Sequence, residues 1–282
     1  MPPIPDSPFP IPRHIAFIGG GTMARSLIGG MISNGASTHN IVVSEPSAPL
    51  RNALAHDFNV TVHASNEDAA LNADVLVLAV KPQLIKTVCS GLRAVAQSRK
   101  PLVISIAAGI RIEQLQLWLG DGIPIVRCMP NTPALIGAGA TGLCANAHAS
   151  ATQREFAKSI LGAAGLTAWI DEEVLMDTVT ALSGSGPAYF FLLVEALEDA
   201  AVDQGLPRAT ARALAVQTCL GAGRMLTEDG AAPEELRRRV TSPEGTTAAA
   251  LDSFAASDFS VIVARAVAAA TARGRELSTQ LE

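Results

Sequence analysis

A glycine-rich turn near the start of the chain limits the fold more than any other feature of the sequence. Residues 15–24 read IAFIGGGTMA, an apolar run that leads into the pattern G-x-G-x-x-A. In this pattern Gly19 permits a tight turn, Gly21 lets the backbone approach a pyrophosphate, and Ala24 lets the following helix pack closely on its strand. The sequence therefore predicts a βαβ dinucleotide-binding unit, with an ordinary strand-to-helix turn as the alternative.

Further short apolar runs continue through the first half of the chain. They do not alternate apolar with polar residues, and stretches long enough for crossover helices separate them. Such strands are typical of a parallel sheet that is covered on both faces. The predicted strands span residues 15–18, 40–44, 60–62, 75–80, 102–106 and 123–126.

The second half of the chain is predicted to be helical. After about Glu172 the strand pattern disappears, and the first helical stretch, PAYFFLLVEALEDAAVDQ, is apolar on nearly every side over its first half. A helix of this kind is buried on all faces, which a small domain achieves most easily by packing on a second copy of itself. We therefore expect an obligate dimer, with burial inside the monomer as the alternative. The predicted helices span residues 187–204, 207–226, 233–240 and 258–281.

These two patterns divide the chain near residue 172. We expect an α/β protein with an N-terminal Rossmann-type parallel-sheet domain over residues 14–172, followed by an all-α substrate and dimerisation domain over residues 173–282. Residues 1–13 are rich in proline and are predicted to be a disordered lead-in. They have neither the basic start nor the apolar stretch of a secretory signal peptide.

The composition disfavours several classes of partner. The formal net charge is −5, so the chain has no general electrostatic attraction to nucleic acid or to an anionic membrane. No apolar run reaches the ~20 residues that span a bilayer. Four cysteines are scattered without a C-x-x-C pair, which predicts reduced thiols, no metal site and a cytoplasmic location.

The residue that follows the second predicted strand bears on the choice of dinucleotide. An acidic side chain at this position, here Glu45, typically hydrogen-bonds the adenosine ribose of NAD. It would repel the 2′-phosphate of NADP by about 4 kcal/mol at ~4 Å and an effective dielectric of ~20. Ser44, Ser47 and Arg51 are close enough in sequence to offset this repulsion. We therefore expect a preference for NADH, with NADPH as the alternative.

Small residues at two other strand ends could line the rest of a dinucleotide site. Residues 79–82 read AVKP and residues 107–109 read AAG, and ligands of parallel sheets bind outside the carboxyl ends of the strands. The segment 127–133, RCMPNTP, could border the cofactor in the same way. Each segment could equally be a strand end or a proline-stiffened turn that binds no ligand.

A second candidate site is the sequence TSPEGTT before a run of alanines. Ser242 followed by Pro243 is typical of a helix N-cap and first helical residue. Unpaired N–H groups of Gly245, Thr246 and Thr247 could then hold a substrate carboxylate, with the Thr247 hydroxyl as a further donor. A well-capped helix without a ligand is the alternative.

The predicted helical domain contains neither lysine nor histidine, because Lys158 and His148 are the last of each in the chain. Enzymes that interconvert alcohols and ketones usually need such a base to move the hydroxyl proton, and Tyr189 is the one remaining candidate in this domain. Reduction of an imine is less demanding, since its nitrogen can be protonated beforehand. The sequence therefore favours C=N over C=O reduction, unless a base on the nucleotide-binding domain takes part.

Several motifs together resemble those of one family, pyrroline-5-carboxylate reductase, the last enzyme of proline synthesis. The resemblance runs from about Ile15 to the C-terminus. It implies NAD(P)H-dependent reduction of L-1-pyrroline-5-carboxylate to L-proline by a homodimer, often assembled into a decamer, with the pocket completed at the dimer interface. The motifs are LSGSGPAY at 182–189 and TSPEGTT at 241–247, supported by AVKP at 79–82, SIAAG at 105–109 and MPNTP at 129–133.

The resemblance also assigns roles to individual residues. Thr246 and Thr247 match positions that bind the substrate carboxylate, and the Thr247 hydroxyl matches a proposed donor to the ring nitrogen. Glu173 matches a contact to the amine or imine. The residues that match cofactor-binding positions are Ile18, Gly19, Gly20, Gly21, Thr22 and Met23 for the pyrophosphate, Asn66 for the adenosine end, and Ala79, Val80, Lys81, Pro82, Ala107, Ala108 and Gly109 for the nicotinamide half.

Two residues depart from the family pattern. Glu244 stands where the family commonly has glycine, so its charge could repel the substrate and its Cβ disfavours a positive φ. Glu45 stands where relatives often carry a small polar residue, which questions the family's frequent preference for NADPH. Two other functions stay open: a related Rossmann dehydrogenase of a β-hydroxy acid, and a non-catalytic dinucleotide-binding redox sensor.

Overall fold

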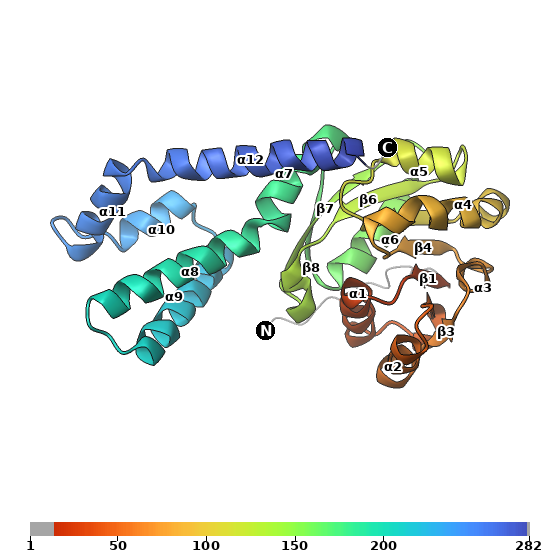
Figure 1. Cartoon of the computed structure of the whole chain (residues 1–282), viewed down its shortest axis with the longest axis horizontal. Helices are drawn as coiled ribbons and strands as arrows, with labels where there is room; N and C mark the ends of the chain where they lie inside the picture. The colour runs from red at the N-terminus through yellow and green to blue at the C-terminus, as the bar shows by residue number, and fades with distance from the viewer. Residues whose placement is uncertain (1–13, 281–282) are drawn as a thin grey trace. The chain divides into compact units, whose positions relative to one another are not determined.

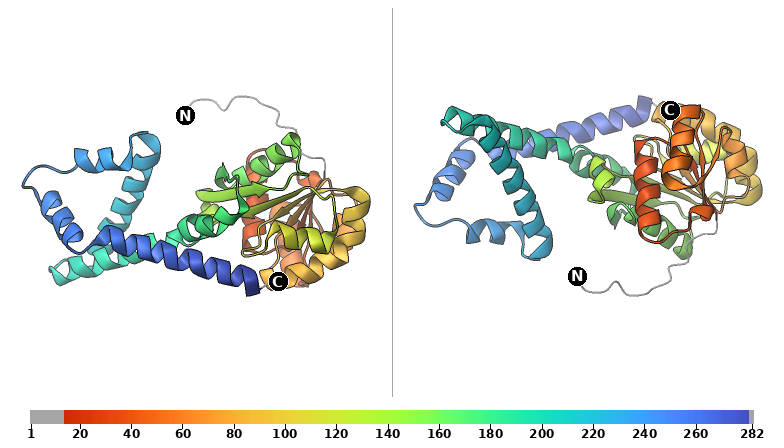
Figure 2. Two further views of the ribbon diagram at one scale, coloured as in Figure 1. Left: turned by 90° about the horizontal axis from the view of Figure 1, so that it is seen from above. Right: turned by 90° about the horizontal axis from the view of Figure 1, so that it is seen from below.

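The computed structural model of the chain describes residues 14–280. Its contacts divide the chain into two compact units, whose elements can be followed in Figures 1 and 2. The first unit holds the described residues up to Gly184 together with those from Ala270 onward, and the second holds Ser185–Ala269. The lead-in predicted over residues 1–13 lies outside the described residues, and the domain boundary predicted near residue 172 stays a prediction.

The first unit is built on an eight-stranded sheet with the order β3-β2-β1-β4-β5-β6-β7-β8. The strands from β1 to β6 pair in parallel, and the strand order reverses between β1 and β4. In sheets of this type a ligand binds where the order reverses, outside the carboxyl ends of the strands. The strands are β1 Ile15–Ile18, β2 Ile41–Ser44, β3 Thr61–His63, β4 Val75–Leu78, β5 Leu102–Ser105, β6 Ile125–Met129, β7 Gly139–Ala145 and β8 Gly165–Trp169.

Two strands of this sheet were not predicted. β7 pairs antiparallel with β6, and β8 pairs parallel with β7, so the predicted parallel sheet is extended at this edge by one antiparallel pairing. Both strands start at glycine, and a Cβ on Gly165 would lie 2.2 Å from the carbonyl oxygen of Gly139. Glycine and alanine have low strand propensity, which hides such strands in the sequence.

Helices cover both faces of the sheet, as the sequence predicts. Ile15 and Phe17 of β1 enter one apolar layer, and Ala16 and Ile18 enter the other. Buried residues of α1, α2 and α6 belong to the first layer, and those of α3, α4 and α5 to the second. These helices are α1 Thr22–Ser33, α2 Ala48–Phe58, α3 Asn66–Ala70, α4 Pro82–Arg99, α5 Ile112–Leu119 and α6 Ala151–Gly162. The shorter elements are the 3-10 turns η1 Thr38–Asn40, η2 Thr132–Ile136 and η3 Glu173–Leu175, the helix α7 Met176–Val179 and the π-helical turn η4 Thr180–Gly184.

The second unit is helical, as predicted. Its first two helices pack against each other, and its last helix continues into the first unit. The helices are α8 Gly186–Asp203, α9 Arg208–Glu228, α10 Pro233–Arg239, α11 Thr246–Ala256 and α12 Phe259–Gln280.

The helix α8 exposes much of its apolar surface in the single chain. Phe190, Phe191 and Leu192 are 60%, 69% and 64% exposed. The alternative that this helix is buried within its own chain is therefore wrong for these side chains. Contiguous apolar surface of this kind is uncommon on proteins that stay monomeric, and it marks an interaction surface.

Within residues 14–280, no single helix is long and apolar enough to cross a membrane. The bent pair formed by α11 and α12 meets the criteria of length and composition only when its two helices are taken together.

A buried carboxylate joins α8 to α9. The side chain of Glu198 is 7% exposed and accepts hydrogen bonds from Arg212 Nε at 2.8 Å and from Arg208 Nη1 at 2.9 Å. These bonds, the one from Arg212 first, hold the pKa of the Glu198 carboxyl below its ordinary value, against the opposing effect of burial. The carboxylate therefore stays charged at neutral pH and links the two helices.

Glu198→Gln should lower the thermal unfolding midpoint by several degrees at pH 7, because the neutral amide cannot replace the charge-assisted bonds. A lowered folded-state pKa stabilises the fold above the ordinary pKa of about 4.3, and this stabilisation is lost as the pH falls through the folded-state value. The difference between the variant and the parent should therefore shrink as the pH falls below the ordinary pKa of the carboxyl. Glu228→Gln, which removes an exposed pair with Arg224, is the matched control. Equal midpoints for the parent and Glu198→Gln at pH 7 would contradict the stabilising role of the Glu198 carboxylate.

Candidate active site

The turn after β1 can be formed only by glycine. Gly19 has φ +99°, and its N–H donates to the carbonyl oxygen of Ser44 at 2.9 Å. A Cβ at this position would lie 2.8 Å from the carbonyl oxygen of Ala79 and 2.9 Å from Val80 Cγ1. The turn is therefore held between the ends of β2 and β4, at the predicted edge of the sheet.

The turn leads directly into the N-terminus of α1. Gly21 is the N-cap, and Thr22 and Met23 are the first helical residues, so their N–H groups have no partner within the helix. A Cβ on Gly20 would lie 2.3 Å from Leu54 Cδ1, whereas a Cβ on Gly21 would meet no described heavy atom within 4 Å. Open space in front of a helix N-terminus suits an anionic group such as a pyrophosphate.

The carboxylate of Glu45 is bound by the main chain of the site. Glu45 follows β2, is 8% exposed, and accepts N–H bonds from Gly20 at 3.2 Å and from Ser47 at 2.9 Å. Arg51 Nη1 donates to the Glu45 carbonyl oxygen at 2.7 Å. The carboxylate therefore contacts the glycine-rich turn itself, and its predicted contact with the ribose stays a prediction. Ser47 and Arg51 bond to Glu45 directly. That these two residues and Ser44 offset the repulsion of a 2′-phosphate stays a prediction.

Asn66 lies near the same edge of the sheet. It is the first residue of α3, and its Oδ1 accepts a hydrogen bond from the buried Ser44 hydroxyl at 2.7 Å. Because Ser44 and Glu45 are adjacent, the structure brings Asn66 and Glu45 together at the end of β2. Both residues were predicted for the adenosine end of the cofactor.

The predicted nicotinamide segments follow neighbouring strands. Residues 79–82 follow β4 and residues 107–109 follow β5, and these strands pair in parallel. Lys81 is the exposed N-cap of α4, Ala107 is buried, and Gly109 has φ +77°. The two segments therefore lie at the same carboxyl edge as the glycine-rich turn.

Asn131, in the segment after β6, links two parts of the first unit. Its Nδ2 donates to the carbonyl oxygen of Ser183 at 2.9 Å, and its Oδ1 accepts the Ala140 N–H at 2.9 Å. The buried amide thus ties the start of β7 to the turn η4. These bonds give the MPNTP segment a structural role, and its role beside a cofactor stays a prediction.

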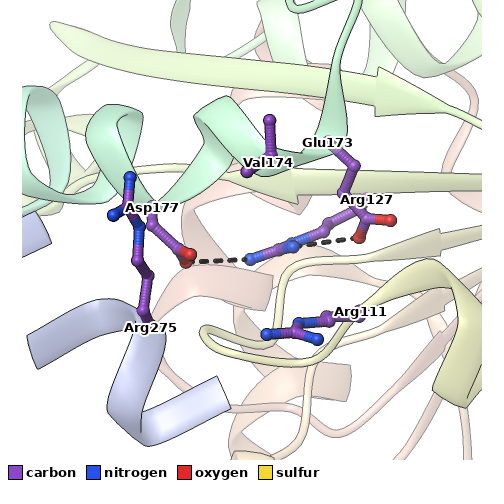
Figure 3. Close-up of a pocket in the computed structure, with 6 residues that line it drawn as sticks. All are labelled: Arg111, Arg127, Glu173, Val174, Asp177 and Arg275. Carbon is purple, nitrogen blue, oxygen red and sulfur yellow. Dashed lines mark hydrogen bonds and ion pairs between the residues drawn. The ribbon is translucent and has the colours of Figure 1, made fainter. Parts of the chain in front are cut away.

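Glu173 belongs to a cluster of charges on the first unit, which Figure 3 shows in close-up. Its Oε1 accepts the Ile112 N–H at 2.8 Å and a bond from Arg127 Nη1 at 2.9 Å. Arg127 Nη2 also lies 3.7 Å from Asp177 Oδ1. Glu173 therefore anchors the start of α5 and neutralises a buried arginine, and its predicted contact with the substrate stays a prediction.

Sequence reasoning missed the pairing of Arg127 with Glu173 and Asp177. Arg127 is the one charged residue in the strand IVRCM, and a lone charge inside a buried strand signals a buried partner. The sequence gives no indication of which carboxylate that partner is.

The helix at the TSPEGTT motif begins later than predicted. Its N-cap is Gly245, with Thr246 as the first helical residue, so Ser242 is not the N-cap. The Gly245 N–H donates to the Ser242 carbonyl oxygen at 3.1 Å and closes a turn in which Glu244 has φ +55°. A residue with a Cβ adopts this left-handed conformation at a cost of about 1–2 kcal/mol. Three N–H groups were predicted to bind the substrate carboxylate. That of Gly245 is therefore already used in this turn, and those of Thr246 and Thr247 remain.

The described residues contain no cluster of three or more His, Cys, Asp or Glu side chains that could hold a metal ion. The four cysteines, all described, are free. Burial raises the pKa of the Cys89 thiol to about 12, and it also raises the pKa of the Cys128 and Cys144 thiols. These thiols therefore stay protonated and unreactive at neutral pH.

Two family models match this chain. Residues 173–277 match pyrroline-5-carboxylate reductase dimerisation, and residues 14–109 match NADP oxidoreductase, coenzyme F420-dependent. The pyrroline-5-carboxylate reductase of Pseudomonas aeruginosa is 52% identical over 95% of this chain and 98% of its own length. The chain belongs to the pyrroline-5-carboxylate reductase family. The resemblance inferred from its motifs is therefore confirmed.

Solved structures of pyrroline-5-carboxylate reductases share this fold. The enzyme of Coxiella burnetii is 43% identical, with a TM-score of 0.92 over 94% of this chain and 98% of that one. The enzyme of Plasmodium falciparum, solved with NADP bound, is 32% identical, with a TM-score of 0.80 over 94% and 98%. The predicted combination of a Rossmann-type sheet with a helical dimerisation region is confirmed, and the match to a dimerisation model supports a homo-oligomer.

Two alanine substitutions should separate folding from dinucleotide binding. Gly19→Ala forces a Cβ against the Ala79 carbonyl oxygen at a positive φ, so the thermal unfolding midpoint should fall. Gly21→Ala should leave that midpoint unchanged and weaken NADPH binding roughly tenfold or more, because its Cβ enters the space before α1. Differential scanning fluorimetry and a fluorescence titration with NADPH measure the two effects. Parental affinity in Gly21→Ala would show that the pyrophosphate does not bind at this turn.

Proposed function

We propose that the protein reduces L-1-pyrroline-5-carboxylate to L-proline with NADPH or NADH. The observation that carries this proposal is the 52% identity with a named reductase over nearly the full length of both chains. In the balanced reaction, the carbon of the C=N bond takes a hydride and the ring nitrogen takes a proton, while the dinucleotide is oxidised. Reduction of an imine also agrees with the lack of lysine and histidine in the sequence after residue 158.

The glycine-rich turn suits the dinucleotide. A side chain is sterically excluded at Gly19, and a Cβ on Gly20 would require Leu54 to move. The free space beside Gly21 precedes the N-terminus of a twelve-residue helix. In the proposal, Ile18–Met23 form the pyrophosphate site, with the N–H groups of Thr22 and Met23 at the start of α1 as donors. Glu45 and Asn66 bind the adenosine end, and Ala79–Pro82 with Ala107–Gly109 line the nicotinamide. When bound, the reduced nicotinamide supplies the hydride.

The substrate contacts are proposed for the start of α11 and for Glu173. The N–H groups of Thr246 and Thr247 bind the carboxylate, since the first residues of a helix have unpaired donors. Gly245 is the N-cap of this helix. The Thr247 hydroxyl donates to the ring nitrogen, and Glu173 contributes negative charge toward the amine or imine. Positioning of the imine, rather than a strong general base, provides most of the catalysis.

We also propose that the working enzyme is a homodimer located in the cytoplasm. The exposed apolar side chains of α8 and the match to a dimerisation model support the dimer. The free cysteines agree with a reducing compartment. Assembly into a decamer is an extension of this proposal that sedimentation velocity can test.

A single assay tests the proposed reaction against the other two functions. Oxidation of NADPH and of NADH is followed by the absorbance of the reduced nicotinamide, with pyrroline-5-carboxylate and with keto acids. With β-hydroxy acids, the reverse reaction is followed as reduction of NADP+ and NAD+. Turnover with pyrroline-5-carboxylate alone is the expected result. Turnover with hydroxy or keto acids would indicate the related dehydrogenase, and dinucleotide binding without any turnover would indicate a sensor.

Thr247→Ala should lower kcat at least roughly tenfold, because it removes the proposed donor to the ring nitrogen. The dissociation constant for NADPH should not change. Thr247→Ser retains the hydroxyl and should keep most of the activity, and Thr227→Ala, which removes an exposed hydroxyl on α9, is the control for a threonine change alone. Parental kcat in Thr247→Ala, measured by steady-state kinetics, would refute the assigned role.

Glu45→Gln should raise kcat/KM for NADPH relative to NADH by roughly tenfold, equivalent to about 1.4 kcal/mol. The neutral amide keeps an acceptor for the Ser47 N–H and removes the charge that would repel a 2′-phosphate. Glu113→Gln, at an exposed position, is the control. An unchanged ratio between the two dinucleotides would mean that the Glu45 charge does not face the 2′-position.

A further inference from the structure

The charge cluster around Arg127 borders a cavity of about 310 Å³. This volume is at the lower end of the range of roughly 300–1,000 Å³ for small-molecule pockets. None of the residues proposed for dinucleotide binding is among those that line it. The lining residues, drawn in Figure 3, are Arg111, Arg127, Glu173, Val174, Asp177 and Arg275, and all belong to the first unit.

The carboxylate of Asp177 is nearly buried, and few groups of the protein stabilise its charge. Its side chain is 11% exposed, and its ion pair with Arg127 spans 3.7 Å, which is too long for a hydrogen bond. No described residue donates a hydrogen bond to it. Arg127 meanwhile bonds Glu173 at 2.9 Å. Burial of a carboxylate costs free energy unless donors surround it, so Asp177 favours a cationic N–H group in the cavity.

Arg275, in contrast, favours an anionic group in the cavity. Its guanidinium makes no hydrogen bond or ion pair with another described residue. A Cβ on the preceding Gly274 would lie 3.5 Å from Asp177 Cβ, so α12 runs close to the carboxylate at this point. Figure 3 shows the Arg275 side chain extending beside Asp177. Among the described residues, the guanidinium of Arg275 thus has no ion-pair partner and lies next to a carboxylate that accepts no hydrogen bond, and the two do not pair with each other.

A ligand that satisfies both groups carries a cation and an anion on one small framework. Arg127 and Glu173 neutralise each other, and Arg111 Nη1 lies 3.4 Å from Glu113 Oε1. This leaves Asp177 to attract an ammonium group and Arg275 to attract a carboxylate. From this arrangement we infer that the cavity binds a small α-amino acid as a zwitterion, with its ammonium group at Asp177 and its carboxylate at Arg275. This site is additional to the proposed reaction, and Glu173 is the one residue common to both.

Isothermal titration calorimetry of the full chain without dinucleotide tests the zwitterion requirement. Glycine, L-alanine and L-proline are the probes at up to ~10 mM, and propionate and ethylamine each provide one half of the charge pattern. At least one amino acid should bind, and both half-ligands should bind at least roughly tenfold more weakly. No binding by any amino acid, or equal binding by propionate or ethylamine, would overturn the inference.

Four variants locate the binding site. Arg275→Gln removes an exposed guanidinium and should weaken amino-acid binding at least roughly tenfold, whereas Arg273→Gln, two residues away and paired with Glu276, should not. Asp177→Asn should weaken binding as well, provided that its thermal unfolding midpoint shows a folded protein. Thr247→Ala should retain binding. Binding that is lost in Thr247→Ala and kept in Arg275→Gln would assign the amino acid to the active site and overturn the inference.

The turnover assay separates this inference from the proposed function. Arg275→Gln should keep the parental kcat and KM for pyrroline-5-carboxylate, because Arg275 has no role in the proposed reaction. Loss of turnover in Arg275→Gln would show that the cavity belongs to the reaction itself and would also overturn the inference.

Discussion

The close approach of two backbone segments at the switch point of the sheet determines the rest of the nucleotide-binding unit. Gly19 passes so near the carbonyl oxygen of Ala79 that no side chain fits between them. The Ala79 N–H donates to the Ile18 carbonyl oxygen at 2.8 Å, so the end of β4 is bonded to the end of β1 just before the turn. This contact fixes where α1 begins, and it brings the ends of β2, β4 and β5 around one N-terminus.

A second constraint comes from charge inside the first unit. Arg127 is buried on a central strand, and only a carboxylate can stabilise it there. Glu173 meets this need and also accepts the first N–H of α5, so one side chain joins β6, α5 and the segment that leads to α7. The nearby Asp177 pairs with the same guanidinium over the longer distance of 3.7 Å. Asp177 lacks a close partner because two carboxylates share one buried arginine.

The sequence predicted features that depend on local patterns. The strands from β1 to β6 were found to within about three residues, because their apolar runs need no knowledge of distant partners. The strands β7 and β8 were missed because they are rich in glycine and alanine, which have low strand propensity. In the structure these small residues let the two strands approach closely. The start of α11 was misplaced because Glu244 adopts a left-handed conformation that its residue type disfavours. The Arg127 cluster joins residues that are far apart in sequence, and no spacing rule connects them.

The last helix has a consequence for dissecting the protein. α12 begins in the second unit and ends in the first, where Thr271 and Ser278 are buried. The nucleotide-binding unit is therefore assembled from two separate stretches of sequence, and a chain cut after Gly184 would lack its final helical turns. A minimal version of this unit requires residues 270–280 to be rejoined to the truncated chain through a linker. For the same reason, the gene segment for the first unit could not be exchanged as one continuous piece.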